Sequence, residues 1–588
     1  MTDERLDAYR RAEQPIPRKM RRWHLYGAGF ENLGRSGEPE EVEVPAYGPD
    51  ELLVRQDACG LCFSDTKVIA LGPGHPRMTG RDLSKDPVTL GHEVACTVVG
   101  VGQNLQGRFA VGDRFVIQAD VFYEGKSMAY GYAIRGGLAQ YSVIPRAIIE
   151  GDEGCYLLPI RPDTGYVEAA LVEPWACVVS AYAQTHRDGI RPGGRMLVAG
   201  SDEAAGRPYD WRDLFAPDRK PDRALTWRLH GAALEALAAQ AAQCGFPLEP
   251  VEGQDWATLK TERTEGRGFD DILILGSARP ETIEGAATVL ADHGILNLVT
   301  DRPIPRKLSL DIGRIHYNWH HYLGTTTDRP ADAYREVRTA DLQPGGTAWF
   351  IGAGGPMGQM HVQRAVQRRQ PPHRIVATDI DAARLASVVE RFLRQAAERG
   401  IELIALNPNA LGEDAFLHTL RKLGEKRGFD DIVSLVPVPG VIEQAADFLA
   451  EGGWLNIFAG VARGTLAQLD MNQIVRGRCR FLGSSGSSLA DMRETLARVE
   501  NDELSTNASL AAIGGMDAAA EGLRAVKEGR FPGKTLIFPQ IAHLSLTALS
   551  DLKERFPTVY ARLKDGQFWT QGAEEELLRL MVTQETAT

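Results

Sequence analysis

The chain repeats itself, and this internal repeat constrains its fold more than any other feature of the sequence. Four pairs of segments match in the same order: 190–200 with 342–352, 267–272 with 427–432, 294–297 with 453–456, and 323–324 with 482–483. The offset runs only from 152 to 160 residues, and 267–272 recurs unchanged. Collinear matches at a nearly constant offset indicate a duplicated unit. We therefore interpret residues 190 to about 330 and 342 to about 490 as two copies.

Within each copy, short apolar runs alternate with stretches of helical periodicity. In the second copy the expected strands are 348–351, 374–378, 431–436 and 454–459, and the expected helices are 359–369 and 382–399. Strands that alternate with helices form a parallel sheet covered on both faces. The repeat therefore predicts an α/β protein with two tandem Rossmann-like units, each a doubly wound parallel sheet.

The segment before the repeat has a different character. Runs rich in Val at 51–56, 94–102 and 114–119 stand between Gly-rich turns, with few long helical patterns, which predicts a mostly β domain. Helical periodicity returns at 544–563 and 574–581. We expect a first Rossmann-like unit at 189–335, a second at 336–489 and a C-terminal helical extension at 541–588.

The composition excludes several classes of function. Lys and Arg number 66 against 78 Asp and Glu, a net charge of −12, so the basic surface that nucleic-acid binding needs is not expected. The chain has no run of about 18 apolar residues, and its start lacks the blocks of a signal peptide. Seven cysteines in 588 residues are too sparse for a disulfide framework. We expect a cytoplasmic protein that binds neither nucleic acid nor membrane.

A glycine-rich loop follows the first predicted strand of the second copy. Glycines allow a tight turn and let backbone N–H groups approach a pyrophosphate at the positive end of a helix. Asp379 ends the second predicted strand, 21 residues after the last glycine, where a carboxylate accepts hydrogen bonds from ribose hydroxyls. No arginine directly follows Asp379 to balance a 2′-phosphate, so NAD is preferred over NADP. The expected cofactor contacts are Gly352, Gly354, Gly355, Pro356, Met357, Gly358, Asp379 and Arg384.

The spacing of this loop, G-x-G-x-x-x-G, is one residue longer than the usual fingerprint, and a purely structural glycine turn is the alternative. In the first copy Gly200 and Gly206 remain, but Asp202 and Glu203 stand where glycines would meet the pyrophosphate. Side chains and negative charges there oppose phosphate binding. We expect the first copy to bind no dinucleotide and to act as a scaffold or interaction surface, with an altered ligand site as the alternative.

A group of candidate metal ligands lies in the β-rich domain. Cys59 and Cys62 are followed by His92 and Glu93, and later by Glu173. Thiolate, imidazole and carboxylate groups suit zinc, and three protein ligands with one open position suit a catalytic zinc site. Two buried small residues, or a redox pair, are the alternative interpretation of the two cysteines.

Taken together and in this order, the motifs resemble the zinc-dependent medium-chain dehydrogenase/reductase (alcohol dehydrogenase) family, particularly its polyol dehydrogenase and L-sorbose-1-phosphate reductase-like branch. They are CGLCFSD at 59–65, GHE at 91–93, LVEP at 171–174, and FPGKT at 531–535, which looks like the family's return strand. The resemblance covers 20–185 and 342–540, and leaves out the first copy, an insertion at 73–86 and the tail. It implies a GroES-like zinc catalytic domain formed by 1–188 with 490–540.

The resemblance also implies a ligand set. Cys62 and His92 would be zinc ligands, and the carboxylate ligand would be Glu173, ranked slightly ahead, or Glu93. Cys59 would be a packing residue. The four cysteines of the family's structural zinc site are missing between residues 120 and 141. One catalytic zinc and no structural zinc are therefore expected.

The same resemblance implies a reaction. Asp65 would orient His92, Ser64 would take the proton of the alcohol, and Lys67 stands where many relatives have a relay histidine. The expected activity is zinc-dependent hydride transfer between a secondary alcohol of a polyol or sugar derivative and NAD. A reductase of a phosphorylated or other anionic ketose, and a catalytically lapsed zinc- and nucleotide-binding scaffold, are the alternatives. A homo-oligomer is a further expectation, although the duplicated sheet could occupy within one chain the interface that relatives use between chains.

Overall fold

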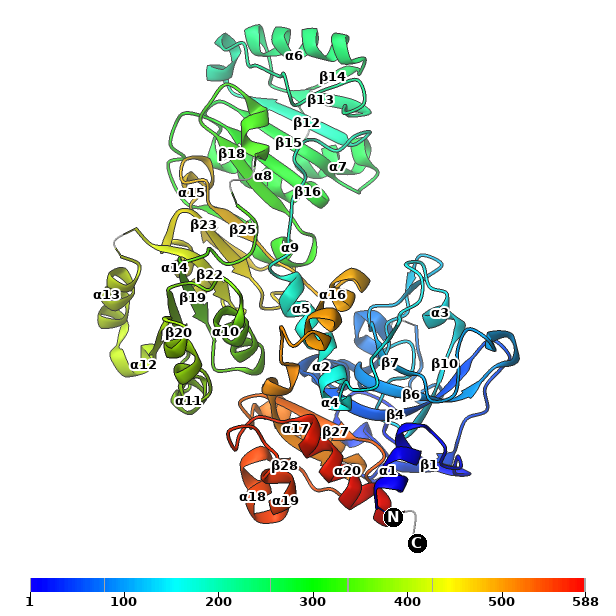
Figure 1. Ribbon diagram of the computed structural model, residues 1–588. Helices are drawn as coiled ribbons and strands as arrows, with labels where there is room; N and C mark the ends of the chain where they lie inside the picture. Colours follow the sequence, from blue (N-terminus) through cyan, green and yellow to red (C-terminus); the bar gives the residue numbers. More distant parts are fainter. Residues whose placement is uncertain (1, 79, 254, 336–337, 426, 586–588) are drawn as a thin grey trace. The chain divides into compact units, whose positions relative to one another are not determined.

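The computed structural model divides the chain into two compact units (Figure 1). It describes residues 2–78, 80–253, 255–335, 338–425 and 427–585. One unit contains residues 1–179, 355–360 and 486–588, and the other contains residues 180–354 and 361–485. The first unit therefore combines the predicted β-rich domain with the predicted tail, and the second unit contains both repeats. The expected boundary at 335 and 336 falls beside 336–337, which lie outside the described residues.

An eight-stranded sheet forms the core of the first unit, in the order β11-β7-β6-β4-β27-β26-β28 with β10 paired to β4. Its strands are β4 (Leu52–Leu61), β6 (Glu93–Val101), β7 (Arg114–Ile117), β10 (Tyr141–Ile144), β11 (Leu157–Pro159), β26 (Leu510–Gly515), β27 (Lys534–Phe538) and β28 (Thr547–Ala548). Smaller pairs are β1 (Lys19–Arg22) with β3 (Glu40–Glu43), β2 (His24–Leu25) with β5 (Val88–Thr89), and β8 (Phe122–Tyr123) with β9 (Lys126–Ser127). Because β27 pairs with β4, a late segment completes a sheet begun by an early one.

Helices of the first unit are short. They are α1 (Thr2–Arg10), α2 (Phe63–Leu71), α3 (Arg146–Ile149), α4 (Tyr166–Ala170), α5 (Val172–Ser180), α16 (Leu489–Glu500), α17 (Ala519–Glu528), α18 (Leu552–Arg555), α19 (Pro557–Tyr560) and α20 (Gln571–Glu585). The predicted helical stretch 544–563 is instead β28 and the two short helices α18 and α19.

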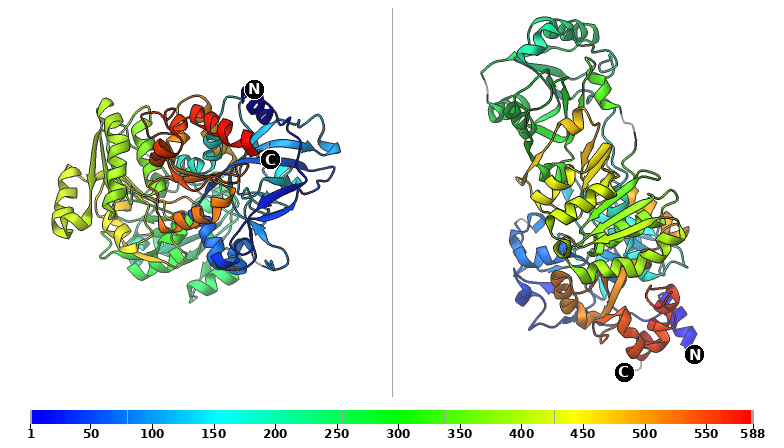
Figure 2. Two further views of the ribbon diagram at one scale, coloured as in Figure 1. Left: turned by 90° about the horizontal axis from the view of Figure 1, so that it is seen from below. Right: turned by 90° about the vertical axis from the view of Figure 1, so that its left-hand side faces the viewer.

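The C-terminal extension packs against the N-terminal helix of the chain. Helices α1 and α20 lie side by side (Figures 1 and 2), joined by an ion pair of 2.7 Å between Arg10 and Glu575. The buried carboxylate of Glu574 accepts hydrogen bonds from the backbone N–H groups of Tyr166 and Val167, at 2.7 and 2.8 Å. These two N–H groups open α4 and would otherwise lack intrahelical partners. The extension therefore caps a helix of the first unit.

The second unit holds two six-stranded parallel sheets of one topology, with orders β14-β13-β12-β15-β16-β18 and β21-β20-β19-β22-β23-β25. The first copy has β12 (Arg195–Gly200), β13 (Arg223–Trp227), β14 (Leu248–Val251), β15 (Phe269–Leu275), β16 (Leu290–Val299), β17 (Leu308–Asp311) and β18 (His321–Thr325). The second has β19 (Thr347–Ile351), β20 (Arg374–Thr378), β21 (Glu402–Leu406), β22 (Phe429–Ser434), β23 (Leu449–Ile457), β24 (Leu466–Leu469) and β25 (Arg480–Leu482). The predicted pair of Rossmann-like units is confirmed.

The helices differ between the copies. The first copy has α6 (Gly231–Cys244), α7 (Trp256–Thr264), α8 (Pro280–Thr288) and α9 (Ile312–Tyr317). The second has α10 (Pro356–Gln367), α11 (Ala382–Glu398), α12 (Pro408–Leu411), α13 (Glu413–Leu423), α14 (Pro439–Ala446) and α15 (Asn472–Val475). After β12 the first copy forms only a 3-10 turn at Asp202–Gly206 and irregular chain up to β13, whereas the second copy forms α10 after β19. The expected alternation of strands and helices therefore fails at this one connection.

The longest of these helices, α11, shows how the sequence specifies an element. Its N-cap Asp381 accepts hydrogen bonds from the N–H groups of Ala383 and Arg384, both within the first turn. Buried apolar residues follow at helical spacing along one face: Leu385, Val388, Phe392 and Ala396. The helix therefore buries one stripe of side chains, and it lies beside β20 (Figure 1).

The two copies meet about an approximate twofold axis. Strand β17 pairs antiparallel with β24, and Ser309 lies opposite Gln468, its own equivalent at an offset of 159 residues. Ser309 N–H donates to Glu284 at 2.8 Å, and Gln468 N–H donates to Glu443 at 2.7 Å, again equivalents at that offset. One hydrophobic core runs through both copies and includes Leu298, Ile312, Leu469 and Ile474.

Candidate functional site

Cys62 lies at the junction between β4 and α2. It is the N-cap of α2, and the carboxylate of Asp65 accepts a hydrogen bond of 2.9 Å from the Cys62 N–H, which closes a capping box. The same carboxylate accepts the Gly91 N–H at 3.3 Å. The start of the helix thus fixes the thiol relative to the segment that carries the neighbouring histidine.

His92 and Glu93 stand at the start of β6, which pairs with β4 so that Glu93 lies opposite Gly60. A Cβ atom at Gly60 would collide with the Glu93 carboxylate. Glycine at this position therefore gives the glutamate room to fold over the strand toward Cys62.

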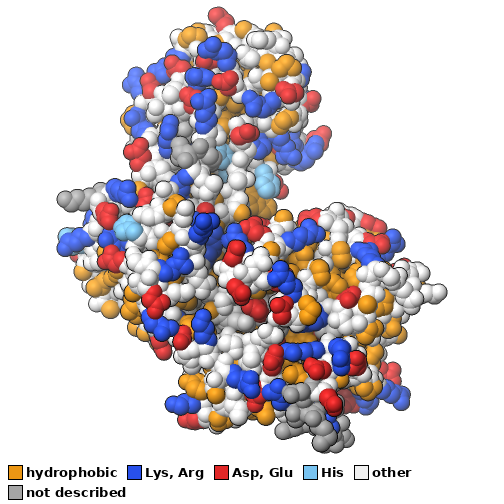
Figure 3. All heavy atoms as spheres, in the orientation of Figure 1, with side chains coloured by type: hydrophobic (Ala, Val, Ile, Leu, Met, Phe, Trp, Pro, Cys, Tyr) orange, Lys and Arg blue, Asp and Glu red, His pale blue; other side chains and the backbone are white. Residues whose placement is uncertain are grey.

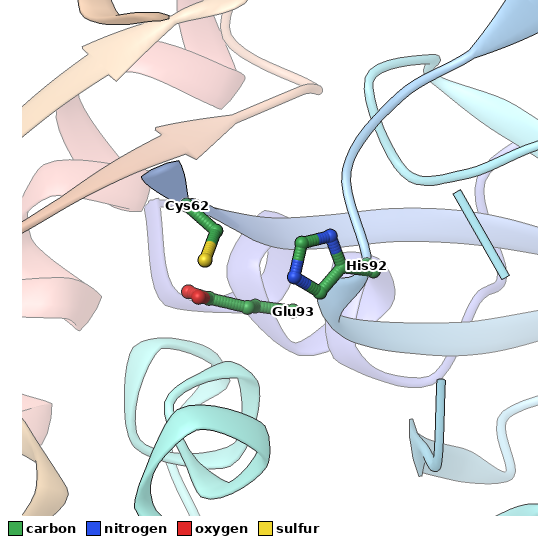
Figure 4. A group of neighbouring side chains, drawn as sticks. All are labelled: Cys62, His92 and Glu93. Atoms are coloured by element: carbon green, nitrogen blue, oxygen red, sulfur yellow. The ribbon is translucent and has the colours of Figure 1, made fainter. Parts of the chain in front are cut away.

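Together these residues form a metal-ligand group. One ligand atom from each of Cys62, His92 and Glu93 lies within 4.8 Å of the other two (Figure 4). Glu93 Oε2 is buried and has no hydrogen-bond partner among the described residues, and an unpaired buried carboxylate oxygen is costly unless a cation completes it. Thiolate, imidazole and carboxylate oxygen are ligands that zinc accepts, so the group fits a zinc ion.

Two neighbours act on His92. Asp65 Oδ1 lies 3.2 Å from His92 Nδ1, so the imidazole can turn Nε2 toward the metal position. Burial opposes ionisation of Asp65, but the His92 charge and hydrogen bond outweigh it and lower the pKa of this carboxyl. Ser64 Oγ lies 3.3 Å from His92 Nε2, which places a hydroxyl at the edge of the metal group.

Lys534 is a site residue that the sequence prediction missed. Its ammonium lies 2.5 Å from Glu93 Oε1, and both side chains are buried. Burial opposes the charge of Lys534, but Glu93 outweighs it and raises the pKa of the lysine. A cation on one carboxylate oxygen leaves Oε2 as the oxygen for a metal. The FPGKT motif pointed to this strand, but not to this contact.

The other predicted carboxylate has a different place. Glu173 lies in the first turn of α5 and is not part of the group within 4.8 Å. Burial raises the pKa of Glu173 to about 7, and the His92 charge opposes that rise. Glu173 therefore interacts electrostatically with the residues of the site. That Glu173 ranks ahead of Glu93 as the carboxylate ligand stays a prediction. Cys59 is fully buried in the core and also lies outside the group.

Tyr132 is a second residue that the sequence prediction missed. Its buried ring lies 5.6 Å from the His92 ring, centroid to centroid. Burial raises the pKa of Tyr132, and the charge of His92 opposes that rise. Lys67, one turn along α2 from Ser64, is exposed, with its ammonium 5.8 Å from the centre of the Phe63 ring.

The predicted cofactor loop leaves the end of β19. Gly354 donates its N–H to Asp379 Oδ2 at 2.9 Å, and Asp381 N–H donates to Oδ1 at 2.9 Å. A Cβ atom at Gly354 would stand 2.7 Å from the Arg384 Cβ and 2.9 Å from Asp379 Oδ2, so only glycine fits. Gly352 has φ of +79°, in the left-handed region that glycine adopts without strain. The loop, the acid and Arg384 thus form one local arrangement.

The helix after the loop begins earlier than predicted. Helix α10 starts at Pro356, directly after Gly355, and includes Met357 and Gly358 in its first turn. Proline suits a first helical position because its missing N–H has no intrahelical partner to lose. The N-terminus of a twelve-residue helix therefore faces the loop, which is the arrangement that binds phosphate groups.

The first copy lacks each of these features. Its loop continues as the 3-10 turn at Asp202–Gly206, and Asp202 is fully exposed. At the place of Asp379, directly after the second strand, stands Arg228, whose guanidinium lies over the Trp227 ring at 4.6 Å. Neither the helix N-terminus nor the acid Asp379 of the second copy has an equivalent in the described residues of the first copy.

A triad suited to zinc in a β-rich unit, with a dinucleotide-type loop on a parallel sheet, defines the class of metal-dependent oxidoreductases that use a nicotinamide cofactor. Residues 48–150 match the family described as the alcohol dehydrogenase GroES-like domain. The chain belongs to the zinc-dependent alcohol dehydrogenase, or medium-chain dehydrogenase/reductase, family, as a 30% identical relative from Klebsiella pneumoniae shows. The family indicated by the sequence motifs is confirmed, and so is the prediction that the protein is an oxidoreductase.

The chain is similar to three curated proteins that show where in this family its sequence lies. L-sorbose 1-phosphate reductase of Klebsiella pneumoniae is 30% identical over 49% of this chain and 72% of its own length. Mannitol-1-phosphate 5-dehydrogenase of Aliivibrio fischeri is 29% identical over 51% of this chain and 75% of its own. Uncharacterized protein YggP of Escherichia coli is 26% identical over 91% of this chain and 93% of its own. In the described part of the chain, no helix is long and apolar enough to cross a membrane.

Proposed function

We propose that the protein reversibly oxidises a secondary alcohol of a polyol or sugar derivative, with transfer of the hydride to NAD. The observation that carries this proposal is the arrangement of Cys62, His92 and Glu93 with the Ser64 hydroxyl 3.3 Å from His92. The names of two relatives, a polyol phosphate dehydrogenase and a ketose phosphate reductase, support the same substrate chemistry.

Zinc fits this site through the Cys62 thiolate, His92 Nε2 and Glu93 Oε2, with Glu173 as an alternative carboxylate. Bound zinc supplies Lewis acidity, which lowers the pKa of an alcohol hydroxyl and polarises a carbonyl. One zinc ion per chain, and no structural zinc, is our proposal, supported by a single candidate metal group among the described residues.

Side chains of the protein accept the proton that leaves the substrate hydroxyl. Ser64 Oγ accepts it from the substrate hydroxyl, and Asp65 holds the His92 ring in place at 3.2 Å. Tyr132, whose ring lies 5.6 Å from the His92 ring, is our candidate for the next group on the proton path. Lys67, an exposed residue of α2, stands where many relatives have a relay histidine.

For the cofactor, we propose NAD rather than NADP at the second copy. Asp379 is the supporting residue, because the N–H groups of Gly354 and Asp381 hold its carboxylate at the end of β20. A ribose 2′-hydroxyl can donate to this carboxylate, whereas a 2′-phosphate would be repelled by it. We propose further that the first copy carries no nucleotide.

Replacement of Cys62 by Ser tests the metal assignment. We expect the variant to lose zinc, which elemental analysis measures. We also expect kcat/KM to fall at least about 1,000-fold, since a metal contributes several kcal/mol to catalysis. NADH absorbance over a panel of polyols measures this activity. The matched control is Cys59→Ala, which removes a buried thiol outside the group and should retain zinc. A zinc-free Cys62→Ser enzyme with full activity would overturn the assignment.

The same assay separates the enzyme from a lapsed scaffold. A scaffold would retain zinc and NAD but oxidise no member of a panel of polyols and sugar phosphates. The presence of Ser64 beside the metal group favours the enzyme, because a hydroxyl at 3.3 Å from His92 has no metal-binding role to fill. Turnover of one panel member, abolished by a chelator, would exclude the scaffold.

A further inference from the structure

Basic side chains lie near the metal-ligand triad, on α2 and in the segment that follows it. On the face in Figure 3, Lys and Arg side chains lie among Asp and Glu side chains over most of the surface. Near the triad, Lys67 lies on α2, and His75 and Arg77 lie in the segment after α2. Arg77 and His75 belong to the insertion that the family resemblance did not cover, so the family motifs give them no role.

Aromatic contacts tie this group to the metal site. The Arg77 guanidinium lies 5.1 Å from the centre of the Tyr132 ring, and the His75 ring lies 5.6 Å from it. On the same tyrosine, the His92 ring is also 5.6 Å away. Both basic residues are therefore separated from a metal ligand by a single buried ring.

Arg77 is held in place but keeps donors for a ligand. Asp120 accepts a hydrogen bond of 2.6 Å from Arg77 Nη1, and a guanidinium has five N–H donors. The Arg77 side chain is 39% exposed, so solvent and small solutes reach it. Against the effect of burial, Asp120 and, more weakly, Glu173 raise the pKa of Arg77, so it stays charged.

The positive charge of Arg77 affects the neighbouring His75. Burial, followed by the positive charges of Arg77 and Lys67, lowers the pKa of His75. Arg77 thus places a positive charge beside the triad, with Lys67 as a further cation on α2, and a neutral polyol has no charge to pair with either. A phosphate ester has that charge, and its oxygens match the planar fork of arginine.

We propose that Arg77, assisted by Lys67, forms an anion subsite beside the metal triad that binds the phosphate group of a phosphorylated polyol or ketose. This inference rests on the proposed function and names its substrate class. Arg77 supplies directional hydrogen bonds, and Lys67 supplies a second positive charge. His75 borders the subsite, and its Nδ1 accepts a hydrogen bond of 3.3 Å from the Arg77 N–H, which shapes the turn.

The test compares a hexitol with its terminal phosphate ester, both assayed with the zinc-loaded enzyme and NAD. We expect the wild type to have a KM for the ester at least about 10-fold below that for the neutral hexitol, because a charged hydrogen bond favours binding by this factor or more. Arg77→Gln should remove this preference, Lys67→Gln should weaken it, and Arg77→Lys should restore part of it. Arg146→Gln, at an exposed arginine paired with Glu150, is the control and should retain the preference.

Calorimetric titration of inorganic phosphate gives a readout that does not depend on turnover. Phosphate should bind the zinc- and NAD-loaded wild type and not the Arg77→Gln variant. An unchanged preference and unchanged phosphate binding in Arg77→Gln would overturn the subsite. If the wild type oxidises neither substrate, the proposed function is wrong, and the phosphate titration alone decides the subsite.

Discussion

The two Rossmann-like copies share a sheet order and a core but differ in the loop after their first strand. In the second copy, β19 leads through Gly352 and Gly354 into α10, and Asp379 stands beside the loop. In the first copy, β12 leads into a 3-10 turn with exposed Asp202, and Arg228 replaces the acid. The fold therefore depends on the strands and their core, whereas the dinucleotide binding that we propose depends on one loop, one helix and one acid.

The copies make equivalent contacts where they meet. The pairing of Ser309 with Gln468, its equivalent, places an approximate symmetry axis between β17 and β24. A Cβ atom at Gly324 would stand 2.7 Å from Val475 Cγ2, and one at Gly483 would stand 2.8 Å from His316 Cα, contacts that are equivalent at an offset of 159 residues. The two halves thus share an interface even though they differ in ligand chemistry.

The largest test of the difference is Gly354→Ala. The added methyl group would meet Asp379 Oδ2 at 2.9 Å and obstruct the approach of a pyrophosphate. Overpacking together with lost hydrogen bonds amounts to about 3 kcal/mol, so we expect the NAD dissociation constant from calorimetry to rise about 100-fold. The control is Glu203→Ala in the corresponding loop of the first copy, which should leave NAD affinity as it is. Equal effects of the two changes would contradict the comparison.

Asp379→Ala should have the next largest effect. Loss of a carboxylate that accepts ribose hydroxyls costs about 2 kcal/mol, so NAD affinity should fall about 30-fold. NADP should lose less, since the repulsion of its 2′-phosphate is removed at the same time. Arg228→Ala, at the equivalent position, should alter neither affinity. Unchanged NAD binding by Asp379→Ala would place the ribose elsewhere.

The smallest effect tests the shared interface. Gly324→Ala and Gly483→Ala each add one methyl group to a close contact, and each should lower the free energy of unfolding by about 1 kcal/mol in urea titrations. The similarity of the two values is the prediction, because the contacts are symmetry-related. Gly440→Ala is the control: a Cβ atom there meets nothing within 4 Å, and the residue lies in α14, so it should be neutral or slightly stabilising. A strong effect at only one of the two positions would show that the two contacts are not energetically equivalent.

The repeat and the strand patterns could be predicted from the sequence because local order decides them. Residues 374–378 form β20 as expected, and the β strands near 94–102 and 114–119 differ from β6 and β7 by one or two residues at their ends. The missing helix after β12 was not predictable in this way. Gly200 to Arg223 spans nearly the same length as Gly352 to Arg374, so an alignment conceals the change from helix to irregular chain.

For the site, the motif residues could be predicted and their partners could not. Asp65, Ser64 and His92 come together because they flank one strand pair, which the motif spacing indicates. The contact between Lys534 and Glu93 joins residues 441 positions apart, and depends on β27 entering the sheet beside β4. Tyr132 reaches the site from a loop without a recognisable pattern. Such contacts follow from topology, which a single sequence does not reveal.

The joining of β17 to β24 has a consequence for how the protein behaves when it is dilute. Two separate subunits that meet edge to edge come apart as their concentration falls below the dissociation constant. Here both partners lie on one chain, connected through residues 326–346, so the local concentration of one partner around the other does not change with dilution. The support that the first sheet gives to the second therefore persists in a single molecule.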